Sequence, residues 1–188
     1  MGLFNNIFKK KRSDFVPSAD LMTEDRFWGL IKTSFERAKG DYENQQAELP
    51  KLLMELNLQD IILFDNRFRQ LRGEALDWNL WGAIYIIKGG CGDDEFSDFR
   101  SWVIANGKDF YYRLTKNPSS LQDDVVVEVD YEGISYIASD VFKELTGKII
   151  PSDFQENIDV KGEEWSEEGD DLKNRFPMLW EKYAEGEL

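Results

Sequence analysis

Residues 75–88, with the sequence ALDWNLWGAIYIIK, decide the fold more than any other stretch of the chain. They are apolar on nearly every side of a helix, and Gly89 and Gly90 follow them. Glycine takes the left-handed backbone conformation that ends a helix without steric cost. The run therefore predicts a central buried helix, although residues 84–87, IYII, taken alone would also fit a strand.

Three amphipathic segments precede this run. Their apolar residues recur at spacings of three and four, which predicts helices over residues 24–38, 42–56 and 58–71. Thr23 stands where it can cap the first of these helices, and Asn57 where it can cap the third. Pro50 must either kink the second helix or lie in its first turn.

The residues after Gly90 continue the helical pattern. They predict three further helices, over residues 93–106, 109–116 and 134–145, the first capped by Asp93 or Asp94. Residues 125–129, VVVEV, have strand composition, yet the acidic pair before them would equally suit a helix start. We therefore expect a mainly α fold, a compact helical bundle of about six or seven helices, with a minor strand or hairpin near 125–137 as an alternative for that segment.

Composition narrows the classes of function. The chain has 188 residues, 41% hydrophobic, which is enough for one domain with tails. Its one cysteine, Cys91, cannot form an internal disulfide, so a reducing cytoplasm is the expected compartment. The chain has no histidine, which excludes Ser-His-Asp and Cys-His catalysis and imidazole metal ligation. We accordingly predict no catalytic residue, no metal ligand and no cofactor.

Charge points to the kind of partner. The formal net charge is −14, and residues 9–12 contribute +4, so residues 13–188 carry −14 − 4 = −18. Such a body repels DNA and RNA, because nucleic-acid affinity comes largely from neutralising phosphates. A basic protein partner is the natural expectation, although an acidic balance also simply keeps a protein in solution.

The chain divides by composition into four parts. Residues 1–20 form an apolar and basic leader with a linker, and residues 21–150 form the helical domain. Residues 151–172 form an acidic segment that we expect to be mobile, and residues 173–188 an aromatic segment that docks on the domain. The start, MGLFNNIFKKKR, would suit a weak contact with an anionic membrane, although a frayed or self-docked terminus explains it more simply.

Two acidic stretches hold the candidate site residues. The first is residues 89–100, GGCGDDEFSDFR, where the glycines expose backbone amides and the carboxylates could bind a hard cation. The end of one helix followed by the start of the next explains the same residues without a ligand. Residues 153–171 carry nine carboxylates against one lysine, a net charge of −8. The candidates for binding a partner or a cation are Asp93, Asp94, Asp98, Arg100, Glu163, Glu164, Trp165, Glu167 and Glu168.

The succession of motifs TEDRFWGLI, LLMEL, DIILFDNRFRQL, the long run ALDWNLWGAIYIIKGGCGDDEFSDFRSWVIANGKDFYYRL and the tail FPMLWEKY resembles the bacterial family of domain of unknown function 4240. The resemblance spans about residues 22–183. It implies a compact, mainly helical domain and implies no function.

Two functional hypotheses remain. The first is a non-enzymatic, acidic protein-protein interaction domain, with an immunity protein that neutralises a bacterial toxin as its most specific form. The second is a cation-dependent carboxylate enzyme or metal-binding module that uses Asp93, Asp94 and Asp98.

Overall fold

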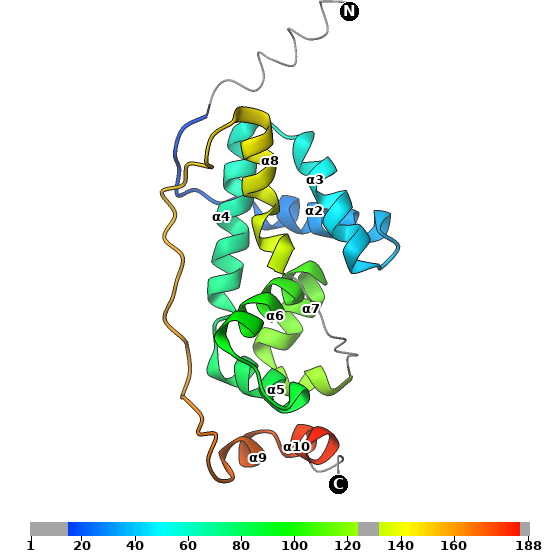
Figure 1. Ribbon diagram of the computed structural model, residues 1–188, viewed down its shortest axis with the longest axis vertical. Helices are drawn as coiled ribbons and strands as arrows, with labels where there is room; N and C mark the ends of the chain where they lie inside the picture. The colour runs from blue at the N-terminus through cyan, green and yellow to red at the C-terminus, as the bar shows by residue number, and fades with distance from the viewer. Residues whose placement is uncertain (1–14, 124–131, 185–188) are drawn as a thin grey trace, which may run out of the picture. The chain divides into compact units, whose positions relative to one another are not determined.

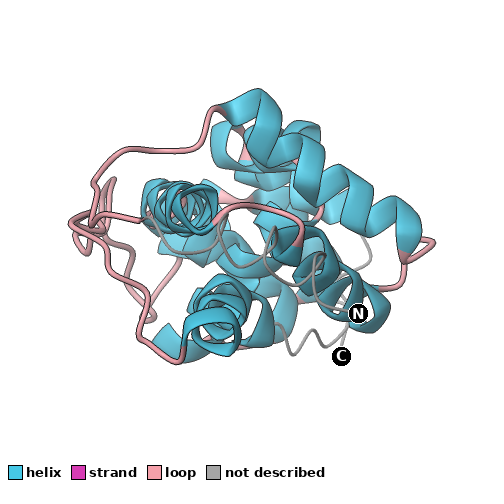
Figure 2. Ribbon diagram, turned by 90° about the horizontal axis from the view of Figure 1, so that it is seen from above, coloured by secondary structure: helices cyan, strands magenta, loops and turns pink. Residues whose placement is uncertain are grey.

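The computed structural model describes residues 15–123 and 132–184 of the chain. This part of the chain contains helices, turns and loops but no strand, apart from one isolated parallel bridge between Asp77 and Lys161 (Figure 2). The mainly α prediction is thus confirmed. The strand at 125–129 and the leader at 1–12 lie outside the described residues. The alternative hairpin near 125–137 is wrong for its described part, because residues 132–137 are helical.

The helices are shown in Figure 1, and in chain order they are α2 (Glu24–Arg37), α3 (Tyr42–Met54), α4 (Leu58–Glu74), α5 (Trp78–Lys88), α6 (Asp93–Ala105), α7 (Lys108–Lys116), η1 (Pro118–Asp123), η2 (Glu132–Tyr136), α8 (Ile137–Thr146), α9 (Asp171–Arg175) and α10 (Pro177–Tyr183). The seven helices predicted from apolar spacing correspond to α2 to α8. The short helices α9 and α10 and the two 3-10 turns were not predicted.

The chain forms two compact units. Unit 1 takes the residues up to Gln70 and Gly133–Glu156, and unit 2 takes Leu71–Glu132 and the residues from Asn157 onward. One boundary falls inside α4, so this helix contributes its first part to unit 1 and its last residues to unit 2.

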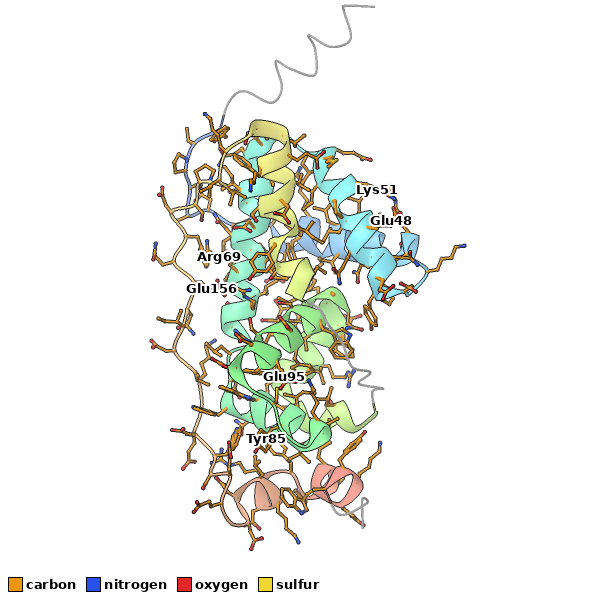
Figure 3. The ribbon with its side chains drawn as sticks, viewed as in Figure 1. Glu48, Lys51, Arg69, Tyr85, Glu95 and Glu156 are labelled. Atoms are coloured by element: carbon orange, nitrogen blue, oxygen red, sulfur yellow. The ribbon has the colours of Figure 1, made fainter. Side chains whose placement is uncertain are left out.

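Unit 1 is built around α3, which packs against α2 and α8. Its core consists of apolar side chains with no exposed surface at all: Phe27, Ile31, Leu49, Leu53, Ile61, Ile62 and Phe142. Two buried polar side chains satisfy each other, because Gln45 Nε2 donates to Ser34 Oγ at 3.2 Å. At the edge, Arg69 pairs with Glu156 at 3.3 Å (Figure 3).

The predicted helix ends of unit 1 are partly confirmed. Asn57 Oδ1 accepts the Asp60 amide at 2.9 Å, which is the capping bond expected before α4. Thr23 occupies the N-cap position of α2, as predicted, but its hydroxyl makes no capping hydrogen bond. Pro50 lies well inside α3 and not in its first turn.

Unit 2 is centred on α5, which packs against η1 and α10, while α6 packs against α7. Asp77 caps α5 by accepting the Asn79 amide at 2.8 Å. Gly89 ends the helix in the left-handed region, with φ 68°, as the sequence predicted.

The C-terminal segment, residues 157–184, packs on α5 through Trp165, Leu172, Phe176 and Leu179, all buried. Gly82 makes this approach possible, because a Cβ there would lie 2.9 Å from Leu172 Cδ2 and 3.2 Å from the rings of Phe176 and Trp165. A glycine inside α5 is therefore explained by packing, not by backbone conformation. The predicted mobility of residues 151–172 stays a prediction.

Candidate functional site

The first acidic stretch forms the start of α6. The helix begins at Asp93, and Gly92 with extended backbone occupies the cap position. Glu95 Oε2 accepts the Gly92 amide at 3.1 Å, and its other oxygen pairs with Lys88 Nζ at 2.7 Å. The bond from Lys88, reinforced by the Gly92 amide, lowers the pKa of Glu95. The predicted cap by Asp93 or Asp94 is wrong, because both residues already lie in the first helical turn.

The four predicted site residues of this stretch fall into two groups: two are exposed to solvent, and two are at least half-buried and contact other parts of the fold. Asp93 and Asp94 are exposed at the helix start, whereas Asp98 is half-buried and makes contacts of its own. Arg100 is only 8% exposed: its Nη1 donates to the Arg72 carbonyl at 2.8 Å, and its guanidinium lies 5.2 Å from the Phe96 ring centre. Arg100 thus ties α6 to the end of α4, and Asp93 and Asp94 remain accessible to a partner.

Cys91, between the two helices, is buried. Burial raises the pKa of its thiol to about 11, even though Lys88 acts in the opposite direction. The thiol is therefore protonated at neutral pH and is a weak nucleophile. Across the part of the chain that the structure describes, no group of three or more Cys, Asp or Glu side chains is arranged to hold a metal ion.

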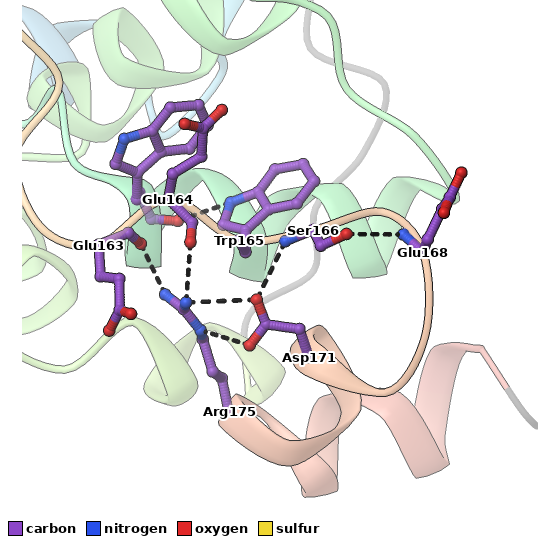
Figure 4. A network of polar contacts seen from close by, with 8 residues as sticks. Glu163, Glu164, Trp165, Ser166, Glu168, Asp171 and Arg175 are labelled. Carbon is purple, nitrogen blue, oxygen red and sulfur yellow. Dashed lines mark hydrogen bonds and ion pairs between the residues drawn. The ribbon is translucent and has the colours of Figure 1, made fainter.

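The second acidic stretch is folded around a buried tryptophan. Trp165 is 8% exposed, and its ring centre lies 5.8 Å from that of Trp78 and 4.7 Å from that of Tyr85. Its indole Nε1 donates to the Trp78 carbonyl at 2.9 Å (Figure 4). The indole that we expected to face a partner instead anchors the acidic loop, residues 163–168, on α5 of its own chain.

Arg175 closes the acidic loop from the side of α9. It donates to the Glu163 carbonyl at 2.6 Å, to the Glu164 carbonyl at 3.0 Å and to the carboxylate of Asp171 at 2.9 Å (Figure 4). Asp171 also accepts the Ser166 amide at 3.0 Å. That amide bond, followed by the contact with Arg175, lowers the pKa of Asp171.

These contacts leave the side chains of Glu163, Glu164 and Glu168 outside the framework of the loop, whereas the Glu167 carboxylate also bonds Tyr85 of α5. Glu163 and Glu164 are held by their backbone carbonyls, and Glu168 by its amide, which donates to Ser166 Oγ at 3.2 Å. The side chains of Glu163, Glu164, Glu167 and Glu168 are exposed. The loop therefore presents four carboxylates from a backbone that its neighbours fix.

Side chains of α5 connect the two acidic stretches. The Trp81 ring centre lies 4.8 Å from that of Phe96 in α6 and 6.4 Å from that of Trp165 in the loop. Burial, followed by the negative charge of Glu167 and a hydrogen bond to its side chain, raises the pKa of Tyr85. Figure 3 labels Tyr85 on α5 and Glu95 on α6. We define the acidic surface as the exposed carboxylates that flank α5: Asp93, Asp94, Glu163, Glu164, Glu167 and Glu168.

Sequence reasoning named Trp165 as a contact for a partner but missed that Trp165 and Arg175 hold this surface. Arg175 follows Asp171 by four positions, a spacing that pairs opposite charges on a helix and could have revealed the contact. The single tryptophan in this acidic run was also a signal for a packing contact, because burial of a large aromatic side chain is strongly stabilising. The contact of Tyr85 with the loop left no signal in the local sequence.

Comparison with protein families places the chain in a family. Residues 22–144 match the model of the family described as "Protein of unknown function (DUF4240)", which is more than half of the chain. The chain belongs to this family. The DUF4240 match includes Asp93, Asp94, Asp98 and Arg100, but it ends before the acidic loop and before the tail FPMLWEKY.

Comparisons with curated proteins and with solved structures each found no match. In the residues that the structure describes, none of the helices has the length and apolar character needed to cross a bilayer.

Proposed function

We propose that this DUF4240 chain is a non-enzymatic protein-binding domain whose acidic surface binds a basic protein partner. One observation carries the proposal: the carboxylates of the acidic loop face solvent, while the fold of the loop depends on its backbone, on Trp165 and on Arg175. The side chains of Glu163, Glu164 and Glu168, which do not hold the loop in place, are available to a ligand.

The fixed loop favours binding for a physical reason. A flexible acidic segment would lose conformational entropy on binding, whereas a loop already held by hydrogen bonds and a buried indole loses less. The negative charge of the surface also attracts a basic partner over a distance and raises the rate of encounter. Both effects predict an affinity that falls as salt rises.

Within this class we propose an immunity protein that neutralises a cognate bacterial toxin. Supporting this proposal are the charge of −18 on residues 13–188, the lack of histidine and the acidic loop beside a cluster of aromatic side chains. The acidic surface would attract a basic toxin electrostatically. The bound domain would then block the toxin's active site sterically, so inhibition needs no catalytic step by this chain.

The test compares two variants with the same change in net charge. One neutralises the loop with E163Q, E164Q, E167Q and E168Q, and the control neutralises exposed glutamates of unit 1 with E36Q, E43Q, E55Q and E144Q. Each variant changes the net charge from −14 to −14 + 4 = −10. The immobilised full chain and both variants are exposed to an extract of the source cells at moderate salt, and the retained proteins are identified.

A basic protein retained by the unchanged chain and by the control, but not by the loop variant, supports the proposal. Equal retention by both variants would show that net charge alone attracts the protein, and no retention would overturn the proposal. Co-expression then tests the immunity form: the captured protein alone should arrest growth, and the unchanged chain should restore it.

The second hypothesis, a cation site at Asp93, Asp94 and Asp98, is tested separately. On that hypothesis, calorimetric titration of the full chain with Mg²⁺, Ca²⁺ and Mn²⁺ would give heat at millimolar metal that D94N and D98N remove, although no three acidic side chains of the described residues are arranged to hold a metal ion. Absence of heat would end that hypothesis without affecting the first.

A further inference from the structure

The C-terminal segment, residues 157–184, contacts α5 in the way that a bound peptide contacts a domain. Its backbone pairs with the start of the helix: the Trp78 amide donates to the Lys161 carbonyl at 2.9 Å, and the Lys161 amide donates to the Leu76 carbonyl at 2.9 Å. Main-chain pairing of this kind is how an extended peptide adds to a domain. The bridge fixes the first part of the segment beside α5.

Three apolar anchors follow along the segment. Leu172, Phe176 and Leu179 are separated by four and three positions, and at most 5% of each is exposed. Their neighbour Met178 is 56% exposed. The helix that carries Leu179, α10, contacts α5 and η1. Buried anchors at these spacings are typical of an amphipathic segment that binds in a groove of another domain.

Gly82 of α5 provides the space that receives these anchors. A Cβ at this position would lie 2.9 Å from Leu172 Cδ2 and 3.2 Å from the rings of Phe176 and Trp165. All three of these nearest atoms belong to the C-terminal segment. The missing side chain therefore accommodates the segment and not another part of the unit.

The groove and the segment belong to different parts of the chain. Both α5 and η1 lie within residues 22–144, which match the DUF4240 family, whereas the C-terminal segment lies after the match. Residues 147–160, which lead from α8 to the bridge, contain no helix or strand. The segment is thus joined to the domain as a tethered ligand is joined by a linker.

We propose that the face formed by α5 and η1 is a peptide-binding groove and that the C-terminal segment is its intramolecular ligand, which an external segment of the same chemistry can replace. That chemistry is an indole that donates to the Trp78 carbonyl, followed by apolar side chains that fill the space over Gly82. The proposal goes beyond a basic partner, because this ligand binds through apolar contacts and backbone pairing. Its replacement would also remove the acidic loop from α5.

The experiment measures binding of a fluorescent peptide with the sequence of residues 157–184 by anisotropy. The full chain with L172A and L179A, whose own segment is weakened, should bind this peptide. The unchanged chain should bind it at least about 100-fold more weakly, because its tethered segment competes at an effective concentration of about millimolar.

The peptide itself carries the matched control, since a buried and an exposed residue are adjacent. L179A in the peptide should lower its affinity at least about tenfold, whereas M178A should leave the affinity unchanged. Equal binding of these two peptides would overturn the proposal, because the anchors would then not enter the groove.

A second chain guards against unfolding of the weakened one, which circular dichroism would reveal. It keeps the anchors unchanged and carries a protease site at residues 157–160, so that cutting removes the tether alone. The labelled peptide should then replace the cut segment in proportion to the two concentrations. If a folded weakened chain binds no peptide, or if the cut chain shows no exchange, the proposal is overturned. No basic partner takes part, so neither outcome bears on the acidic surface.

Discussion

The start of α6 and the acidic loop have similar composition but use their acidic side chains differently. At the start of α6, a carboxylate helps to form the fold, because Glu95 accepts the Gly92 amide and pairs with Lys88. In the acidic loop, the fold comes from carbonyls bound to Arg175 and from the buried Trp165, and the side chains of Glu163, Glu164 and Glu168 remain in solvent.

The difference shows that the number of carboxylates in a stretch does not predict its role. An acid in the first turn of a helix already has a use, since it meets the positive end of the helix dipole and unpaired amides. An acid in a loop fixed by other groups has no such use. The acidic loop is therefore a stronger candidate for binding than the glycine-rich stretch around Asp93.

The largest effect should follow from removing the loop's anchor. Trp165→Ala deletes a buried indole and should lower the free energy of unfolding by about 3–5 kcal/mol. Urea unfolding measures the loss, and hydrogen exchange should show faster exchange of the Ser166 amide while the Gly92 amide stays protected. Trp165→Phe, which keeps a ring but loses the bond to the Trp78 carbonyl, should cost less. Equal exchange at both amides would contradict the comparison.

A smaller loss should follow from removing the guanidinium that closes the loop. Arg175→Met keeps the apolar stem but removes the bonds to two carbonyls and to Asp171, and should cost about 2–3 kcal/mol in urea unfolding. Arg175→Lys should recover part of this, since lysine keeps the charge without the planar fork. If Arg175→Lys kept the full free energy of unfolding, the positive charge alone, and not the planar guanidinium, would stabilise the loop.

Two glycine substitutions should have opposite signs. Gly82→Ala places a Cβ 2.9 Å from Leu172 Cδ2 and should destabilise by about 1–3 kcal/mol, despite the better helix propensity of alanine. Gly29→Ala in α2 meets nothing within 4 Å and should stabilise by up to about 1 kcal/mol. Melting temperatures of the two variants test this, and a Gly82→Ala variant as stable as the unchanged chain would contradict close packing of the C-terminal segment.

The smallest effect concerns pH. The pKa values of Asp171 and Glu95 are both lowered, so each carboxylate contributes stability that is present above the ordinary carboxyl pKa of about 4. This contribution is lost as the pH falls from that value through the lowered pKa. Asp171→Asn and Glu95→Gln should each make the free energy of unfolding depend less on pH in this acid range. Urea midpoints measured at successive pH values would show the change. Unchanged slopes would contradict the assigned contacts.

The helices could be predicted because their signals are local. Apolar spacing, the glycine stop at Gly89 and the cap at Asn57 all act within a few residues. The anchoring of the acidic loop could not be predicted in this way, because Trp165 and its acceptor, the Trp78 carbonyl, are 87 positions apart. Local patterns therefore located the candidate carboxylates but not the contacts that hold them.

The stacked indoles beneath the loop give the chain an optical reporter. Trp78 and Trp81 lie 5.1 Å apart with an interplanar angle of 7°, and Trp165 meets Trp78 edge-on. Chromophores this close couple their transitions, so the near-ultraviolet circular dichroism and the emission of these rings depend on how they are arranged. A ligand that shifts residues 163–168 would change both signals, and unlabelled protein would then suffice to follow its arrival in real time.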